Sequence, residues 1–196
     1  MKKASTKVTV IIILLIIVVV GYYAYLSNRK QVLREESNIS EVEKTLSRDM
    51  TLDYPSTPKE VLKYYNEILN CFYNEECTDE EIEKLGSKAR ELYDDELLEN
   101  NDPDTYMIQL KSEIQDYKDK KRHITNMTVS ASTNVERYTV EGNVFARLGC
   151  GYTIKEDSTD RYSNIVYLLR RDENKKWKIY GWDLTENVRT AEKTEE

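Results

Sequence analysis

The chain has few of the residues that define several common classes of protein. Its 196 residues include only 3 Pro and 6 Gly, which excludes a collagen-like chain and one dominated by linkers. Three cysteines without a C-x-x-C pair and a single histidine do not supply the ligands of an ordinary zinc site. Basic charge is also scarce after residue 34, where 23 Lys and Arg face 36 Asp and Glu, a net charge of −13. Such a chain repels phosphates, so we expect no nucleic-acid partner.

One long uncharged run stands out near the amino terminus. Val8–Leu26 reads VTVIIILLIIVVVGYYAYL, and as a helix it would be about 28 Å long, close to the thickness of a bilayer core. Tyr22, Tyr23 and Tyr25 lie near one end, as aromatic residues do at a membrane boundary. A cleaved signal peptide is the alternative, but no A-x-A cleavage site follows the run. We therefore expect an uncleaved single-pass transmembrane helix that contacts the lipid bilayer.

Basic residues on both sides of the run bear on its orientation. The short basic segment 1–7 favours a cytoplasmic amino terminus and an extracytoplasmic carboxy-terminal domain at the cell membrane. Residues 27–53 are polar, with an apolar residue at every third or fourth position, which predicts either a solvated stalk or a packing helix. Residues 54–186 are expected to form the folded domain, and the polar residues 187–196 a flexible tail.

Three helices are expected in the first half of this domain, and each has a clear start. Thr57-Pro58-Lys59-Glu60 combines a capping Thr, a Pro at the first helical position and a Glu that can bond back to the cap. Thr78-Asp79-Glu80-Glu81 repeats the capping box, and Asp102-Pro103-Asp104 opens the third helix. Apolar residues then recur every three or four positions, so each helix should cover a flat surface with one face.

After Arg122 the apolar residues follow a period of two, which predicts strands. The expected strands are 127–132, 138–148, 165–169 and 177–182. Gly142 lies inside the second of them, where a Gly often marks a bulge or bend that lets a sheet curl. We therefore expect an α+β domain in which three helices pack on the concave face of a curved four-stranded antiparallel sheet.

Three segments carry a resemblance to known proteins: TPKEVLKYYNEIL, ELYDDELL and the final hairpin YLLRRDENKKWKIYGWD. Over residues 54–186 this order resembles the nuclear transport factor 2-like superfamily, which implies a cone closed by an aromatic-rich last strand. With the apolar run, the YPSTPKEVLKYYNEILNCFYNEE opening is similar to that of a group of bacterial single-pass membrane proteins. The arrangement is more distantly similar to the inner-membrane assembly subunit of type IV secretion systems. The superfamily includes isomerases, polyketide cyclases and binding scaffolds, so the fold alone selects no function.

No group of residues specifies a reaction. Enzymes on this cone resemble ketosteroid isomerase, with a carboxylate base in the pocket. Here Glu141 is the one acid inside an expected strand, but it lies opposite the apolar face, which favours a solvated residue. His123 follows Lys121 and Arg122 and is expected to end the third helix. The acidic run 94–104 lacks the spacing of a calcium loop. We expect no catalytic, cofactor-binding or metal-binding residues.

Two groups of side chains remain as candidates for a site. Cys71 and Cys77 lie at the end of one helix and just before the next, so the alternatives are a local disulfide and two buried thiols. The last hairpin concentrates aromatic residues, either as core or as an exposed surface for a protein or glycan partner. The aromatic residues of this candidate surface are Tyr167, Trp177, Tyr180 and Trp182.

Together these patterns predict a non-enzymatic, membrane-tethered extracytoplasmic module that binds or scaffolds another envelope protein. One alternative is a small-ligand binder or an isomerase- or cyclase-type enzyme, which requires an open cavity of roughly several hundred Å³ in the cone. The other alternative is a subunit of a secretion or conjugation apparatus, which predicts self-association. The sequence does not decide whether the chain forms homo-oligomers.

Overall fold

A computed structural model describes residue 22 and residues 39–185 of the chain. Residues 41–185 belong to one compact unit. Its helices and strands follow in this order: α2 (Glu41–Ser47), α3 (Pro58–Asn74), α4 (Asp79–Glu91), α5 (Asp95–Glu99), α6 (Pro103–Asp119), β1 (Arg122–Val129), the 3-10 turn η1 (Ser132–Asn134), β2 (Glu136–Val140), β3 (Asn143–Glu156), β4 (Thr159–Arg171) and β5 (Trp177–Thr185).

The sheet is antiparallel and has five strands, not the four expected. The strands lie in the order β1-β3-β4-β5, and β2 also pairs with β3. Strands β1 and β2 therefore pair with different parts of β3: β1 with residues 150–156 and β2 with residues 143–147. The fifth strand arises because the stretch 138–148 is a hairpin of two strands.

The turn of this hairpin explains why two strands form where one was expected. Glu141 has a φ of 49° and Gly142 a φ of 82°, and positive φ at both central residues is the geometry of a tight two-residue hairpin turn. Gly142 therefore turns the chain and does not mark a bulge inside a strand. Val140 pairs with Asn143, so it lies on the opposite face of the sheet from Val144, and it is half exposed.

Both expected capping boxes are confirmed. The Thr57 hydroxyl accepts a hydrogen bond from the Glu60 amide at 3.2 Å, and the Glu60 carboxylate accepts one from the Thr57 amide at 3.1 Å. Thr78 and Glu81 form the same reciprocal pair at the start of α4. Each box satisfies backbone amides that the first turn of a helix leaves without a partner.

We expect the Glu60 cap to make stability depend on acid. Hydrogen bonds to its carboxylate, first from the Ser56 hydroxyl, hold the pKa of Glu60 below its ordinary value of 4.5. The stabilisation is therefore complete above pH 4.5 and is lost as the pH falls through the folded-state pKa. Glu60→Gln should reduce the unfolding free energy more at about pH 6 than at about pH 2, measured by urea unfolding. An equal loss at both pH values would contradict this.

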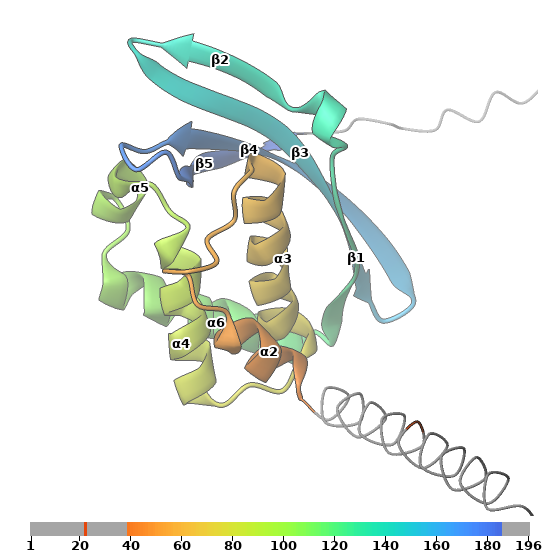
Figure 1. The fold of residues 1–196 in the computed structure, drawn as a ribbon. Helices are drawn as coiled ribbons and strands as arrows, with labels where there is room; N and C mark the ends of the chain where they lie inside the picture. Colours follow the sequence, from red (N-terminus) through yellow and green to blue (C-terminus); the bar gives the residue numbers. More distant parts are fainter. Residues whose placement is uncertain (1–21, 23–38, 186–196) are drawn as a thin grey trace, which may run out of the picture. The chain divides into compact units, whose positions relative to one another are not determined.

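The helices gather on one side of the curved sheet (Figure 1). Successive side chains of β3 point to opposite faces of the sheet, and those of Ala146, Leu148 and Cys150 are buried beneath the helices. From α3, Val61, Leu62 and Ile68 are fully buried in the same core. The core therefore lies between the concave face of the sheet and the apolar faces of the helices.

One edge of the sheet is bordered by the segment between α4 and α5. The Ile179 amide of β5 donates to the Leu92 carbonyl at 2.7 Å, and the Asp94 amide donates to the Ile179 carbonyl at 2.8 Å. Tyr93 thus forms an isolated parallel bridge with Ile179. This bridge brings the start of α5 against the last strand.

Part of the segment predicted as a stalk belongs to the folded unit. Val42 and Thr45 of α2 are buried, and the Tyr64 hydroxyl of α3 donates to the Thr45 carbonyl at 2.9 Å. The compact unit accordingly begins at Glu41, whereas residue 54 was expected. The rest of the predicted stalk up to residue 38, and the predicted tail 187–196, lie outside the described residues.

The expectation of a single-pass membrane protein is corrected. Among the described residues, no helix has both the length and the apolar character needed to cross a bilayer. Apart from Tyr22, the run Val8–Leu26 lies outside the described residues. The predicted cytoplasmic amino terminus and extracytoplasmic domain depended on this helix, so they are withdrawn with it.

Candidate functional site

A cavity of about 280 Å³ lies between the concave face of the sheet and helices α3 and α6. Its lining is mostly aromatic and aliphatic, with one serine and one glutamate. The aromatic part of the lining, hereafter the tyrosine-rich cavity, consists of Tyr65, Tyr73, Tyr117, Tyr152, Tyr167 and Trp182.

The periodicity of the elements explains why these residues meet. On α3, Tyr65, Leu69 and Tyr73 are four residues apart, so they share one face of the helix. On β4, alternate residues point the same way, and Ser163 and Ile165 line the cavity together with Tyr167. The remaining walls come from α6 and from strands β1, β3 and β5.

The tyrosine hydroxyls at the bottom of the cavity bond to other protein groups. Tyr152 donates to the Asn66 side-chain oxygen at 2.9 Å, and its hydroxyl lies 2.8 Å from that of Tyr167. The hydroxyls of Tyr65 and Tyr93 lie 3.2 Å apart. Because these polar groups already have partners, the bottom of the cavity is held in shape without a ligand.

These buried hydroxyls stay protonated. Burial raises the pKa of Tyr65, Tyr152 and Tyr167 well above the ordinary value of 10. At neutral pH they are uncharged and can donate hydrogen bonds, but they cannot serve as bases.

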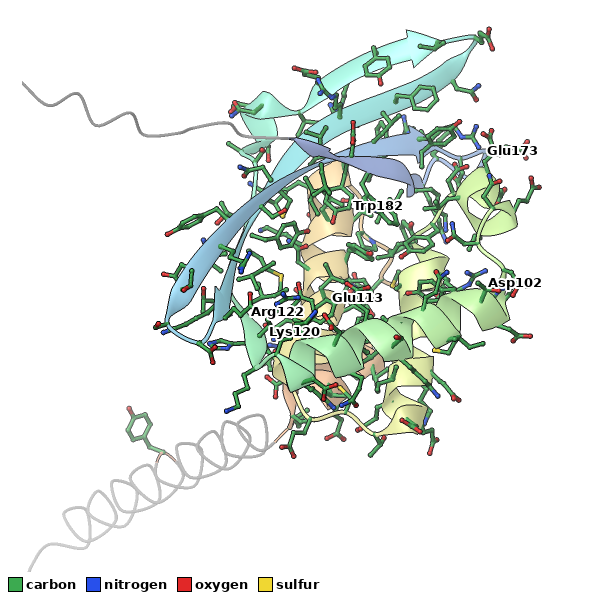
Figure 2. All side chains as sticks on the ribbon, turned by 180° about the vertical axis from the view of Figure 1, so that it is seen from behind. Asp102, Glu113, Lys120, Arg122, Glu173 and Trp182 are labelled. Carbon is green, nitrogen blue, oxygen red and sulfur yellow. The ribbon has the colours of Figure 1, made fainter. Side chains whose placement is uncertain are left out.

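The mouth of the cavity is marked by Trp182 of β5 and Glu113 of α6. Trp182 is 46% exposed, and its ring centroid lies 6.2 Å from that of Tyr167. Glu113 is exposed and bonds to Tyr73, whose pKa is raised by burial and then by this negative charge. Figure 2 labels both residues on the side of the domain where α6 runs in front of the other helices.

The predicted aromatic surface divides into separate parts. Tyr167 is buried in the cavity and Trp182 lies at its mouth. Trp177 is buried elsewhere, where its carbonyl accepts a hydrogen bond from Tyr54 at 2.8 Å. The Tyr180 hydroxyl donates to Glu96 of α5 at 2.8 Å. These four residues therefore form no single exposed surface.

The two candidate cysteines are free thiols near each other. Cys71 is buried, and the Cys77 thiol donates to the Cys71 carbonyl at 3.3 Å. Burial raises the pKa of Cys77 to about 11, so this thiol is protonated at neutral pH and is a weak nucleophile.

His123 and Glu141 lie outside the cavity. His123 is exposed within β1, whereas it was expected to end the third helix, which ends earlier at Asp119. Glu141 is exposed in the hairpin turn. In the described part of the chain, no three His, Cys, Asp or Glu residues lie close enough to hold a metal ion.

Sequence reasoning missed most of the cavity. Its lining includes Tyr65 and Tyr73 of α3 and Tyr117 of α6, which lie among the apolar residues that recur every three or four positions in these helices. The sequence signal that could have indicated the cavity was the large share of tyrosine on the apolar faces of these helices. Glu113 carried no signal, because it lies between Leu110 and Ile114, the buried positions of α6.

Comparison with known proteins identifies a family but no activity. No curated protein matches the chain. A family model described as a domain of unknown function, DUF6715, matches residues 1–182. Because this match covers more than half of the sequence, the chain belongs to the DUF6715 family.

Proposed function

We propose that the domain binds a small organic molecule in the tyrosine-rich cavity. The observation that carries this proposal is an open cavity of about 280 Å³ on the concave face, where side chains could instead have filled the core. Ligand pockets are typically lined by apolar and aromatic groups and have volumes of about 300–1,000 Å³. The volume of this cavity is just below that range, which favours a ligand smaller than most drugs.

The chemistry of the lining favours binding over catalysis. An isomerase- or cyclase-type reaction requires a base close to the substrate, and the buried tyrosines are protonated. Among the described residues that line the cavity, Glu113 is the one carboxylate, and it lies at the exposed mouth. A scaffold role and a role in a secretion apparatus stay predictions, as does the resemblance to nuclear transport factor 2-like domains.

Benzyl alcohol is a suitable first probe because it is small, neutral and aromatic. We expect it to cause a saturable change in tryptophan fluorescence of the full chain, since one of the 2 tryptophans lies at the mouth. Ser163→Phe places a ring inside the cavity and should weaken binding by about tenfold or more, as an occluding side chain would.

Thr153→Phe is the matched control. Thr153 is half-buried on β3 and does not line the cavity, so the same bulky ring should leave benzyl alcohol binding unchanged. Trp182→Phe should remove the fluorescence change. Equal binding to the Ser163→Phe and Thr153→Phe variants would show that the molecule binds elsewhere, and a wild-type chain without saturable binding would contradict the proposal.

A further inference from the structure

We propose that the ligand of the tyrosine-rich cavity is a small organic cation, such as a quaternary ammonium compound, held with its charged group at the mouth. This inference rests on the proposed function and adds the charge of the ligand to it. The support comes from the one charged side chain of the lining, from the aromatic rings around it and from the bonding of the groups deeper inside.

The first argument is the charge at the mouth. Glu113 is the one charged residue among the described residues of the lining. Its bonded partner is the uncharged Tyr73 hydroxyl, and no ion pair joins it to a cationic side chain in the described part of the chain, so its negative charge is not neutralised. An anionic ligand would meet this carboxylate directly. It would also approach a chain that is strongly acidic after residue 34.

The second argument is the set of aromatic rings near Glu113. The rings of Tyr73 and Tyr117 lie side by side, with centroids 4.3 Å apart, and both line the cavity. Trp182 borders the same space from β5 and is half exposed. The faces of aromatic rings attract cations, most strongly for Trp, and several such rings around one carboxylate suit an ammonium group.

The cationic side chain of Arg122 lies near the cavity but pairs with other carboxylates. The Arg122 guanidinium lies 5.9 Å from the centre of the Tyr117 ring. It is held by Asp116 at 3.3 Å and by Glu156 at 3.1 Å, and it is not part of the lining. Arg122 is therefore paired with Asp116 and Glu156 and does not neutralise the charge of Glu113. Figure 2 labels Arg122, the first residue of β1, near the carboxyl end of α6, and Glu113 within α6 itself.

The third argument concerns the deeper part of the cavity. The hydroxyls of Tyr65, Tyr152 and Tyr167 already bond to other protein groups. The rest of the inner lining is apolar apart from Ser163, and consists of Leu69, Ile124, Ile154 and Ile165. A ligand therefore needs few polar groups at its inner end. An apolar body with a single positive charge at the outer end fits both parts of the site.

Choline and neohexyl alcohol provide a matched pair of probes, because a carbon atom in the alcohol replaces the nitrogen of choline. We expect choline to bind the full chain about tenfold more tightly than neohexyl alcohol, measured by the fluorescence of Trp182. Added salt should weaken choline binding and leave neohexyl alcohol binding unchanged.

Glu113→Gln tests the role of the carboxylate. This variant should weaken choline binding by about fivefold and leave binding of neohexyl alcohol unchanged. Asp104→Asn, which removes the same charge from an exposed position at the start of α6, is the control and should bind both probes as the wild type does.

The outcomes separate this inference from the proposed function. If benzyl alcohol binds in the cavity but choline binds no better than neohexyl alcohol, the inference of a cationic ligand is contradicted. The proposal that the cavity binds a small organic molecule then still stands. The same holds if Glu113→Gln and Asp104→Asn weaken choline binding equally. If none of the three probes binds, both proposals fail.

Discussion

Arg170→Met is expected to lower the free energy of unfolding by about 3–5 kcal/mol, because it leaves a buried carboxylate without its cation. The Arg170 guanidinium bonds to both oxygens of Asp94, with Nε 2.9 Å from Oδ2, and to Glu96 at 2.6 Å. The Asp94 side chain is only 4% exposed and that of Arg170 18%. Equilibrium urea unfolding of the full chain measures the loss.

Arg147→Met is the matched control for this variant. Arg147 lies on β3 next to β4 and pairs with Glu136 at 3.5 Å, but its side chain is 51% exposed and that of Glu136 69%. An exposed pair of this kind contributes about 0–1 kcal/mol. If the two Arg→Met variants lost similar stability, the Arg170 pair would not be an important contact between β4 and the start of α5.

Leu169→Ala is expected to cost about 2–5 kcal/mol, because it opens a hole in a fully buried part of the core. Leu169 is 0% exposed, and it pairs across the sheet with Ala146 on one side and Ile179 on the other. Both of these neighbours are also fully buried, so the surroundings have little freedom to fill the space. Thermal or urea unfolding measures the change.

The adjacent residue provides the comparison. Leu168 is half-buried and points to the opposite face of β4, away from the helices. Leu168→Ala removes the same atoms and should cost about 1 kcal/mol or less. A larger loss at Leu168 than at Leu169 would mean that the helices cover the other face of the sheet.

Features set by neighbouring residues were predictable from the sequence. The capping boxes at Thr57 and Thr78 depend on residues three positions apart, and both helices begin where expected. The β2–β3 hairpin was missed because apolar residues continue at even-numbered positions through the turn. A two-residue turn reverses the chain, so Val140 and Val144 lie on opposite faces although their spacing suggests one face.

The candidate site depends on contacts between distant parts of the chain. Tyr167 and Trp182 were expected to belong to one group of aromatic residues, and they do lie beside each other. The position of Glu113 follows from how α6 packs against α3, α4 and β1, which no local pattern specifies. The ion pair between Arg170 and Asp94 likewise joins residues 76 positions apart.

The bridge between Tyr93 and Ile179 has a consequence for association between molecules. Unpaired backbone groups on an outer strand can recruit a strand from another molecule and so start aggregation. At Ile179 both backbone groups are already bonded to Leu92 and Asp94. This part of β5 therefore offers no template to a second chain, and intermolecular strand pairing is blocked there.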